Sequence, residues 1–315
     1  MQRKITSEID PNSNNTRLDL WLSSRFNYHS RNQWQSIIKK GEILVNGAKS
    51  KASKILLTGD KIEFIIDEYN EPDVNRNYKI IFEDENIFAV NKPPDLPCHP
   101  AGIYFKNTLA SILHADLNKK LYLINRLDRE TSGIVLFAKN INNAKFLSNL
   151  FASRNIYKEY IVAVHGNFPD KLDSAGYLTD DTESIIRKKR KFVPTENVNN
   201  NLEKDKLEYC ETYFELINSV NNFSLLKVIP KTGRLHQIRA TLCSIGYPVI
   251  GDKIYGLDDT IFERFINNEI TYKDKEKLIL DHQALHAKCI SFSTSSKQTI
   301  NITTEMPSDI QRIFC

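Results

Sequence analysis

One carboxylate of the chain stands in a setting suited to nucleophilic or acid–base chemistry. Asp128 lies between Arg126 and Arg129 in the stretch RLDRETSG, and the apolar run Ile134–Ala138 follows directly. Flanking cations lower the pKa of a carboxylate and keep it ionised, so Asp128 could act as a nucleophile or as a base. The spacing alone equally allows a structural role, in which Asp128 pairs with a neighbouring arginine and caps the turn.

The sequence around Asp128 resembles the central motif of the RluA-type RNA pseudouridine synthases, in which the aspartate is the essential catalytic residue. Further segments match that family in kind and in order between residues 78 and 295. They are Val90-Asn-Lys92-Pro93 with Cys98-His99-Pro100, Lys158-Glu-Tyr160-Ile, Thr232-Gly-Arg234-Leu-His-Gln-Ile-Arg239, Gly246–Asp252 and Ala284–Ala287. Asn125 and Thr241 stand where the family often has histidine, and these departures bear on substrate preference rather than on reaction class.

The resemblance implies a role for each matching residue. Asp128 would attack the sugar or remove a ribose proton, and neither choice is favoured by the sequence. Tyr160 would stack on the flipped uracil and lie near its re-attached carbon, although the pattern YIVAV by itself favours a core aromatic. Arg234 would pair with Asp128. The other implied pocket residues are Arg126 filling the space of the flipped base, Leu235 and Ile238 forming an apolar floor, and Lys92 in the wall. The reaction requires no cofactor and no metal.

Residues 15–68 form a second region with its own resemblance, to a small RNA-binding domain first described in a ribosomal small-subunit protein. The matching residues are Arg17-Leu-Asp19, Ser30-Arg31, Gly41–Val45, Asn46-Gly47 and Gly59-Asp60. Independently, residues 15–55 contain eight basic and two acidic side chains, which is the charge expected of a surface that binds phosphates. The basic residues expected to contact RNA are Arg17, Arg31, Lys39, Lys40, Lys49 and Lys51.

The patterning predicts an α+β chain of two unequal domains. Helices are expected at 17–26 and 31–40, with Ser30 as a cap, and strands at 42–46 and 61–66. A polar stretch, 69–77, reads as a linker. Residues 78–315 are expected to form the catalytic domain, a mostly antiparallel mixed sheet flanked by helices, one of them at 142–153. A long loop or hairpin is expected at 171–206, which contains the basic run Arg187–Lys191.

The composition excludes several classes of protein. The 315 residues carry 43 basic and 39 acidic side chains, and hydrophobic residues make up 41% of them, which is typical of a soluble globular chain. No apolar run approaches the roughly 20 residues that cross a bilayer, and the polar start, taken as a leader, shows no secretory signal. Five widely spaced cysteines predict reduced thiols rather than disulfides or a zinc site. We therefore expect a cytoplasmic protein.

These observations predict an RNA pseudouridine synthase that isomerises uridines in structured RNA, with large-subunit (23S) ribosomal RNA as the first expectation. Two alternatives stay open. The same chemistry could act on transfer RNA, or the chain could be a non-catalytic RNA-binding or ribosome-assembly factor. A nucleoside glycosidase has little support, because that reaction normally uses two carboxylates and the motif offers one. No protein partner is indicated, and we expect a monomer.

Overall fold

A computed structural model describes residues 3–26, 31–66, 71–186, 188–198, 207–294 and 297–315. The chain divides into two compact units, one of residues 1–74 with 99–116 and one of residues 75–98 with 117–315. Residues 99–116, which were expected in the catalytic domain, thus group with the smaller unit.

The N-terminal unit is built on a four-stranded antiparallel sheet in the order β1-β6-β3-β4, with two helices packed on it. Its strands and helices are β1 (Arg3–Glu8), β2 (Thr16–Arg17), α1 (Leu18–Arg25), α2 (Arg31–Lys40), β3 (Ile43–Val45), β4 (Ala48–Lys49), β5 (Ile55–Leu56) and β6 (Lys61–Ile66), with a 3-10 turn at Pro11–Ser13. Trp21, Leu22 and Trp34 are buried between the helices and the sheet. The two expected helices and strands are therefore present; the Ser30 cap lies outside the described residues.

The expectation of a polar leader was wrong. Arg3–Glu8 pairs with β6 along its whole length, from Arg3 opposite Ile66 to Glu8 opposite Lys61. The run RKITSE alternates only weakly between polar and apolar residues, so nothing local marks it as a strand. It becomes one because β6 offers it a free edge.

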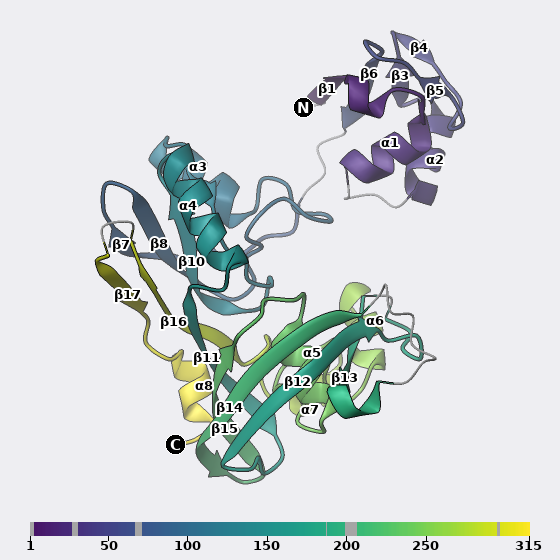
Figure 1. The fold of residues 1–315 in the computed structure, drawn as a ribbon. Coiled ribbons are helices and arrows are strands. Elements are labelled where there is room, and N and C mark those ends of the chain that lie inside the picture. Colours follow the sequence, from purple (N-terminus) through teal and green to yellow (C-terminus); the bar gives the residue numbers. More distant parts are fainter. Residues whose placement is uncertain (1–2, 27–30, 67–70, 187, 199–206, 295–296) are drawn as a thin grey trace. The chain divides into compact units, whose positions relative to one another are not determined.

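The second unit is organised around an eleven-stranded sheet (Figure 1). Its strands are β7 (Lys79–Glu83), β8 (Ile87–Lys92), β9 (Tyr122–Leu123), β10 (Ser132–Ala138), β11 (Tyr157–His165), β12 (Lys171–Asp180), β13 (Arg190–Pro194), β14 (Glu208–Val220), β15 (Phe223–Pro230), β16 (Leu285–Ser293) and β17 (Thr299–Thr303). The main order is β13-β12-β14-β15-β11-β16-β10-β8-β7. Among the described strands, every pairing in this sheet is antiparallel except that of β10 with β16, as expected for a mostly antiparallel mixed sheet.

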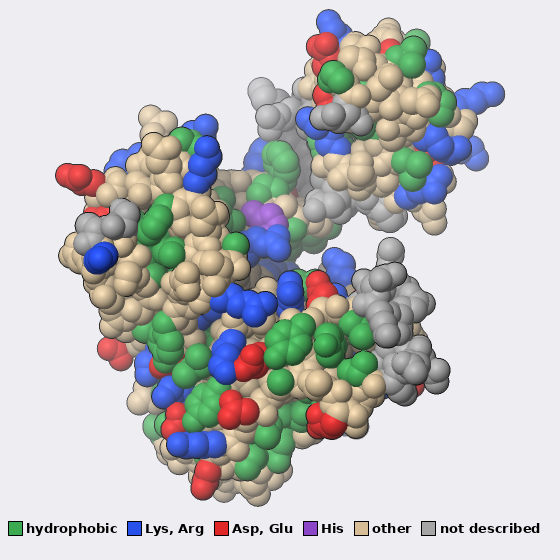
Figure 2. Space-filling view, in the orientation of Figure 1, with side chains coloured by type: hydrophobic (Ala, Val, Ile, Leu, Met, Phe, Trp, Pro, Cys, Tyr) green, Lys and Arg blue, Asp and Glu red, His purple; other side chains and the backbone are tan. Residues whose placement is uncertain are grey.

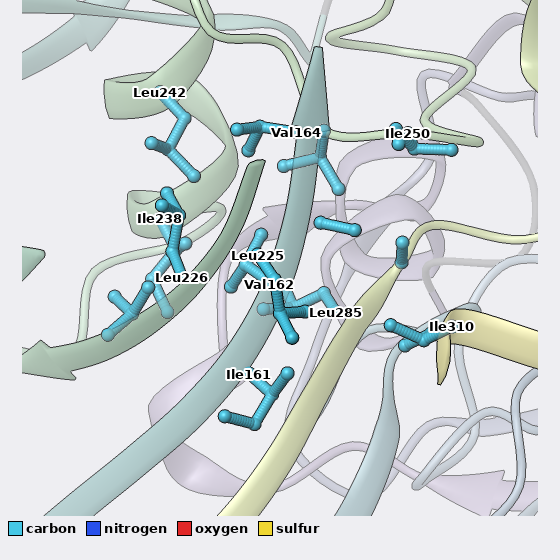
Figure 3. Packing of buried hydrophobic residues seen from close by; sticks show 14 of the residues in the cluster. Ile161, Val162, Val164, Leu225, Leu226, Ile238, Leu242, Ile250, Leu285 and Ile310 are labelled. Atoms are coloured by element: carbon cyan, nitrogen blue, oxygen red, sulfur yellow. The ribbon is translucent and has the colours of Figure 1, made fainter. Parts of the chain in front are cut away.

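Helices accompany this sheet at several points. They are α3 (Leu109–Leu117), which begins in the first unit, α4 (Ile141–Ala152), α5 (Gln237–Ser244), α6 (Thr260–Ile266), α7 (Tyr272–Leu278) and α8 (Ser308–Arg312), with a 3-10 turn at Thr195–Asn197. One core lies between α5 and the strands β11 and β15, where Ile238 and Leu242 of the helix meet Val162, Val164 and Leu226 (Figure 3). This packing fixes α5 against the strand that carries Tyr160.

The polar segments differ in part from the expected linker and loop. Residues 69–70 lie outside the described residues, but Glu71 accepts hydrogen bonds from the backbone N–H groups of Phe105, Lys106 and Asn107. Within the loop or hairpin expected at 171–206, β12 and β13 pair antiparallel, which agrees with the hairpin alternative. Residues 199–206 are outside the described part of the chain.

The basic run at 187–191 is mostly engaged within the protein. Arg187 lies outside the described residues, Lys189 pairs with Asp259 at 2.6 Å, and Arg190 pairs with Glu208 at 2.8 Å. Figure 2 shows acidic, basic and hydrophobic side chains mixed where Figure 1 places β12 and β14, whereas Lys and Arg side chains spread over the visible face of the N-terminal unit. These intramolecular pairs occupy part of the positive charge that the run could otherwise offer to a phosphate. No helix among the described residues is long and apolar enough to cross a membrane.

The parallel contact between β10 and β16 requires a glycine at position 133. Gly133 has φ +114°, and a Cβ built there would lie 2.3 Å from the carbonyl oxygen of Ala287. Gly246 also has a positive φ, +90°, but its Cβ would meet open space. We expect Gly246→Ala to cost about 1 kcal/mol of unfolding free energy through backbone strain alone, and Gly133→Ala to cost at least about 2 kcal/mol more because the strands must separate. Urea unfolding of both variants measures the difference, and equal losses would contradict the close approach.

Candidate active site

A cavity of about 110 Å³ opens beside the start of β10 and the start of α5. Most residues around it come from the segments that the sequence singled out, although the lining runs from Arg126 to Leu285 in the chain. The lining includes Arg126, Asp128, Lys158, Tyr160, Arg234, His236, Ile238 and Arg239. The fold thus brings the separate motifs to one place.

Asp128 lies in a loop that is anchored on both sides. The side chain of Asn125 substitutes for a strand partner, donating to the carbonyl of Ile134 and accepting from the N–H of Leu136. The N–H of Leu127 donates to the sulfur of Cys98, and the carbonyl of Arg129 accepts from the amine of Lys92. The carboxylate therefore stands at the tip of a loop whose backbone is held before and after it.

The partly exposed Asp128 carboxylate ends a chain of charges whose other members, Arg239 and Asp252, are buried. Arg239 Nη1 donates to Asp128 Oδ2 at 2.7 Å, and the same guanidinium donates twice to Asp252, at 2.6 and 2.8 Å. The N–H groups of Ile254 and Tyr255 also donate to Asp252. Since Asp252 is fully satisfied, it holds Arg239 in the plane that meets Asp128.

This arrangement keeps Asp128 ionised. Burial by itself raises the pKa of the Asp128 carboxyl, but the adjacent Arg239 cation outweighs burial, and the net shift is downward. Arg239 in turn keeps its proton, because the effect of burial on its pKa is exceeded by the charges of Asp252 and Asp128. At neutral pH the pocket therefore offers a carboxylate that can attack a carbon or take a proton.

The expected pairing of Arg234 with Asp128 was wrong. Arg234 is exposed at the pocket rim, and its Nε donates to the carbonyl of Tyr209. Gln237 fixes this geometry, because its side-chain oxygen accepts from the N–H of Arg234 and ends the loop there. Helix α5 begins at Gln237. Arg239 lies on the first turn of this helix and is the arginine that donates to Asp128.

The other residues expected in the pocket are distributed unequally. Tyr160 and Ile238 line it, and burial together with the charge of Asp128 raises the pKa of the Tyr160 phenol to about 12, so that it stays protonated. Leu235 does not form a floor: its side chain is 52% exposed and lies outside the lining. Arg126 lines the rim. Lys92 is completely buried behind the loop, and burial lowers its pKa to about 8.

Three residues of the site were not singled out as functional by the sequence. They are His236, Arg239 and Asp252, all within quoted motifs but without a role. His236 Nε2 lies 3.9 Å from Asp128 Oδ1, and its Nδ1 lies 2.9 Å from the hydroxyl of Tyr255. The only available signal was their occurrence in the stretches RLHQIR and GD.

The basic residues of the N-terminal unit fall into two groups. Arg17 and Arg31 form ion pairs with the buried Asp19, at 3.0 and 2.9 Å, and the pair of Arg31 joins α2 to α1. The others are exposed: Lys39, Lys40, Lys49 and Lys51. These four are available to a ligand.

Comparison with known proteins agrees with this site. The pattern of the RNA pseudouridylate synthases matches residues 86–244, which include Asp128, Tyr160 and Arg239. The chain belongs to this family. The S4 domain pattern matches residues 16–62, which confirms the RNA-binding module expected at the N-terminus. This pseudouridine synthase is therefore an RNA isomerase with an S4 domain ahead of its catalytic domain.

Several relatives show how far the similarity extends. The synthase is 30% identical over 284 residues to ribosomal large subunit pseudouridine synthase C of Buchnera aphidicola from Acyrthosiphon pisum, covering 86% of this chain and 85% of the relative. It is 31% identical over 245 residues, 77% of its length, to the mitochondrial tRNA pseudouridine(32) synthase of Saccharomyces cerevisiae, of which it spans half. Human RNA pseudouridylate synthase domain containing 4 has the same fold, with a TM-score of 0.57 at 22% identity over 74% of this chain and 91% of that one.

The two arginines of the downstream motif can be separated experimentally. In Arg239→Gln, burial of Asp128 is no longer opposed, so its pKa rises and the acid limb of the pH–rate profile moves upward by about 1 to 3 pH units. Arg239→Lys keeps a cation and should move the limb less. Arg234→Gln is the matched control, and should leave the limb in place. A limb that moves in Arg234→Gln and not in Arg239→Gln would restore the pairing predicted from sequence.

Proposed function

We propose that this synthase isomerises uridines of large-subunit ribosomal RNA and that Asp128 is its catalytic carboxylate. The observation that carries the proposal is the ionised, loop-anchored Asp128 between Arg239 and the open side of the pocket. The ribosomal target is supported by the similarity to a ribosomal large subunit synthase over most of both chains. The yeast relative, named for a transfer RNA site, gives the second candidate substrate.

The proposed chemistry needs a base outside the RNA stack. The pocket is open and small, so a uridine reaches Asp128 only when it is turned out of its helix. Tyr160 then offers a ring face to the uracil, and Asp128 attacks the sugar or removes a ribose proton. As a neutral phenol, Tyr160 is suited to stacking and to accepting a hydrogen bond more than to taking a proton by itself.

The target is identified by mapping pseudouridines over total RNA with and without the protein. Loss of one or more pseudouridines from large-subunit ribosomal RNA supports the proposal. Loss confined to transfer RNA would replace the substrate and keep the reaction. An unchanged map, with a growth defect rescued equally by the wild type and by Asp128→Asn, would favour the assembly-factor alternative.

Asp128→Asn should abolish pseudouridine formation, since the amide is neither a nucleophile nor a base, while RNA affinity stays within a few-fold. Turnover is measured on the ribosomal RNA transcript that the map identifies, and affinity by filter binding of the same transcript. Because the substitution also removes the ion pair with Arg239, an unfolding curve of the variant checks that its stability is retained. A variant with full turnover would sink the proposed role.

Lys39 and Lys40 stand exposed at the end of α2 and are proposed RNA contacts. Neutralising both to Gln should weaken RNA binding and flatten the log–log salt dependence of affinity by about 0.7 to 0.9 per lost phosphate contact. Lys145→Gln/Lys273→Gln removes the same charge from exposed positions of the catalytic unit and serves as the control. An equal change in both double variants would remove Lys39 and Lys40 from the interface.

We also propose that the protein works as a monomer in the cytoplasm. Its five cysteines are all free thiols, two of them buried, which fits a reducing compartment. Sedimentation at working concentration and fractionation of cells test these two points.

A further inference from the structure

His236 lines the pocket without a role in the chemistry described so far. It is the residue before α5 and adopts a left-handed backbone conformation, φ 57°, which turns its ring toward Asp128. Its side chain is 12% exposed. The ring is thus held between a buried partner on one side and the catalytic carboxylate on the other.

The buried partner determines which ring nitrogen carries the proton. Tyr255 is completely buried, and its hydroxyl oxygen accepts from the N–H of Arg190 at 3.0 Å and lies 2.9 Å from His236 Nδ1. If Nδ1 were the donor, the hydroxyl proton of Tyr255 would have no acceptor among the described residues, which costs about 1 to 3 kcal/mol. The hydroxyl therefore donates to Nδ1, and the ring proton is on Nε2.

The ring is neutral at physiological pH. Burial and then the charge of Arg239 lower the pKa of His236 to about 4, against the opposing effect of Asp128 and Asp252. Besides these, Lys188 and the backbone N–H of Arg190 face the ring system from the β12–β13 hairpin. Nε2–H is accordingly a single, uncharged donor.

A donor and an acceptor then face each other across a gap. His236 Nε2 and Asp128 Oδ1 are 3.9 Å apart, too far for a hydrogen bond, and Oδ1 accepts no hydrogen bond within the described residues. One oxygen atom at about 2.8 Å from both would fill this space. That oxygen must accept from Nε2–H and donate to Oδ1, so a bound nucleotide can supply it only as a hydroxyl.

An internal uridine of RNA has one hydroxyl. Its carbonyl and phosphate oxygens only accept, its ring N–H only donates, and the 3′ and 5′ oxygens are esterified, so the 2′-hydroxyl alone can do both. We propose that His236 and Asp128 together hold the 2′-hydroxyl of the target nucleotide, and that His236 thereby selects ribose over deoxyribose. The inference rests on Asp128 as the catalytic carboxylate proposed above.

The proton position is tested first, without substrate. The full chain labelled with ¹⁵N-histidine reports for each ring which nitrogen is protonated, and the His236 signals are those missing in His236→Asn. We expect a protonated Nε2 and an unprotonated Nδ1. A proton on Nδ1 would overturn the inference, since Nε2 would then have nothing to donate.

The contact is tested by a cycle of two changes. Synthetic RNAs of the mapped target sequence carry uridine or 2′-deoxyuridine at the target position, and kcat/KM is measured for the wild type, His236→Asn and His236→Gln. Asn suits the left-handed backbone but is too short to reach Oδ1, whereas Gln can place an amide N–H near the position of Nε2. Any intrinsic effect of the 2′-group on the sugar is common to all three enzymes and cancels.

Replacing uridine by 2′-deoxyuridine should lower kcat/KM of the wild type, and this loss should be about tenfold or more larger than the loss for His236→Asn. The reason is that the wild-type enzyme leaves a partner group unpaired when the 2′-hydroxyl is missing. His236→Gln should recover part of this discrimination. Equal discrimination by the wild type and His236→Asn would overturn the inference.

Asp128→Asn separates this result from the proposed function. If Asp128→Asn is inactive while His236→Asn discriminates as the wild type does, only the 2′-hydroxyl contact is refuted. If Asp128→Asn is active, the catalytic assignment itself fails.

Discussion

Arg239 is a buried cation shared by the buried Asp252 and the partly exposed Asp128, and the position of three separate chain segments depends on it. It joins the loop of Asp128, the start of α5 and the loop of Asp252. Leaving a buried charge without its partner costs about 3 to 5 kcal/mol, so these segments are not free to move apart. The same contact lowers the pKa of Asp128 and aims its second oxygen at the pocket.

The sheet supplies the rigid frame on which that ion pair closes. Gly133 lets β10 approach β16, which places the end of the Asp128 loop against the strand that follows the Asp252 region. Gly251 makes a comparable approach, because a Cβ there would lie 2.0 Å from the carbonyl oxygen of His282. Both carboxylates are therefore located by backbone contacts that admit no side chain, and Arg239 spans the distance that results.

The sequence predicted which residues line the pocket better than it predicted which of them pair with one another. Asp128, Tyr160 and Ile238 were expected in the pocket from the family resemblance, and they line it. Local patterning alone did not place them, since it favoured a core position for Tyr160. The partner of Asp128 was misassigned because Arg234 lies in the loop before Gln237, where α5 begins, whereas Arg239 lies on the first turn of the helix. The start of the helix depends on the contacts of Gln237 with Thr212 and Thr232, which no local pattern shows. For the same reason β1, whose single partner among the described strands is β6, could not be predicted from the sequence.

The charges of the pocket differ between its rim and its interior, and this arrangement favours an uncharged base carried on the charged backbone of RNA. Arg126, Lys158 and Arg234 stand around the opening, whereas the interior holds two carboxylates, one guanidinium and a neutral imidazole. Phosphates are attracted to the rim and repelled from the interior, where the net charge is negative. A uracil and its ribose, which carry no charge, meet no such barrier. The pocket thus favours one orientation of the nucleotide, with its base and 2′-hydroxyl inward, while overall affinity for RNA is left to the cations of the rim and of the S4 domain.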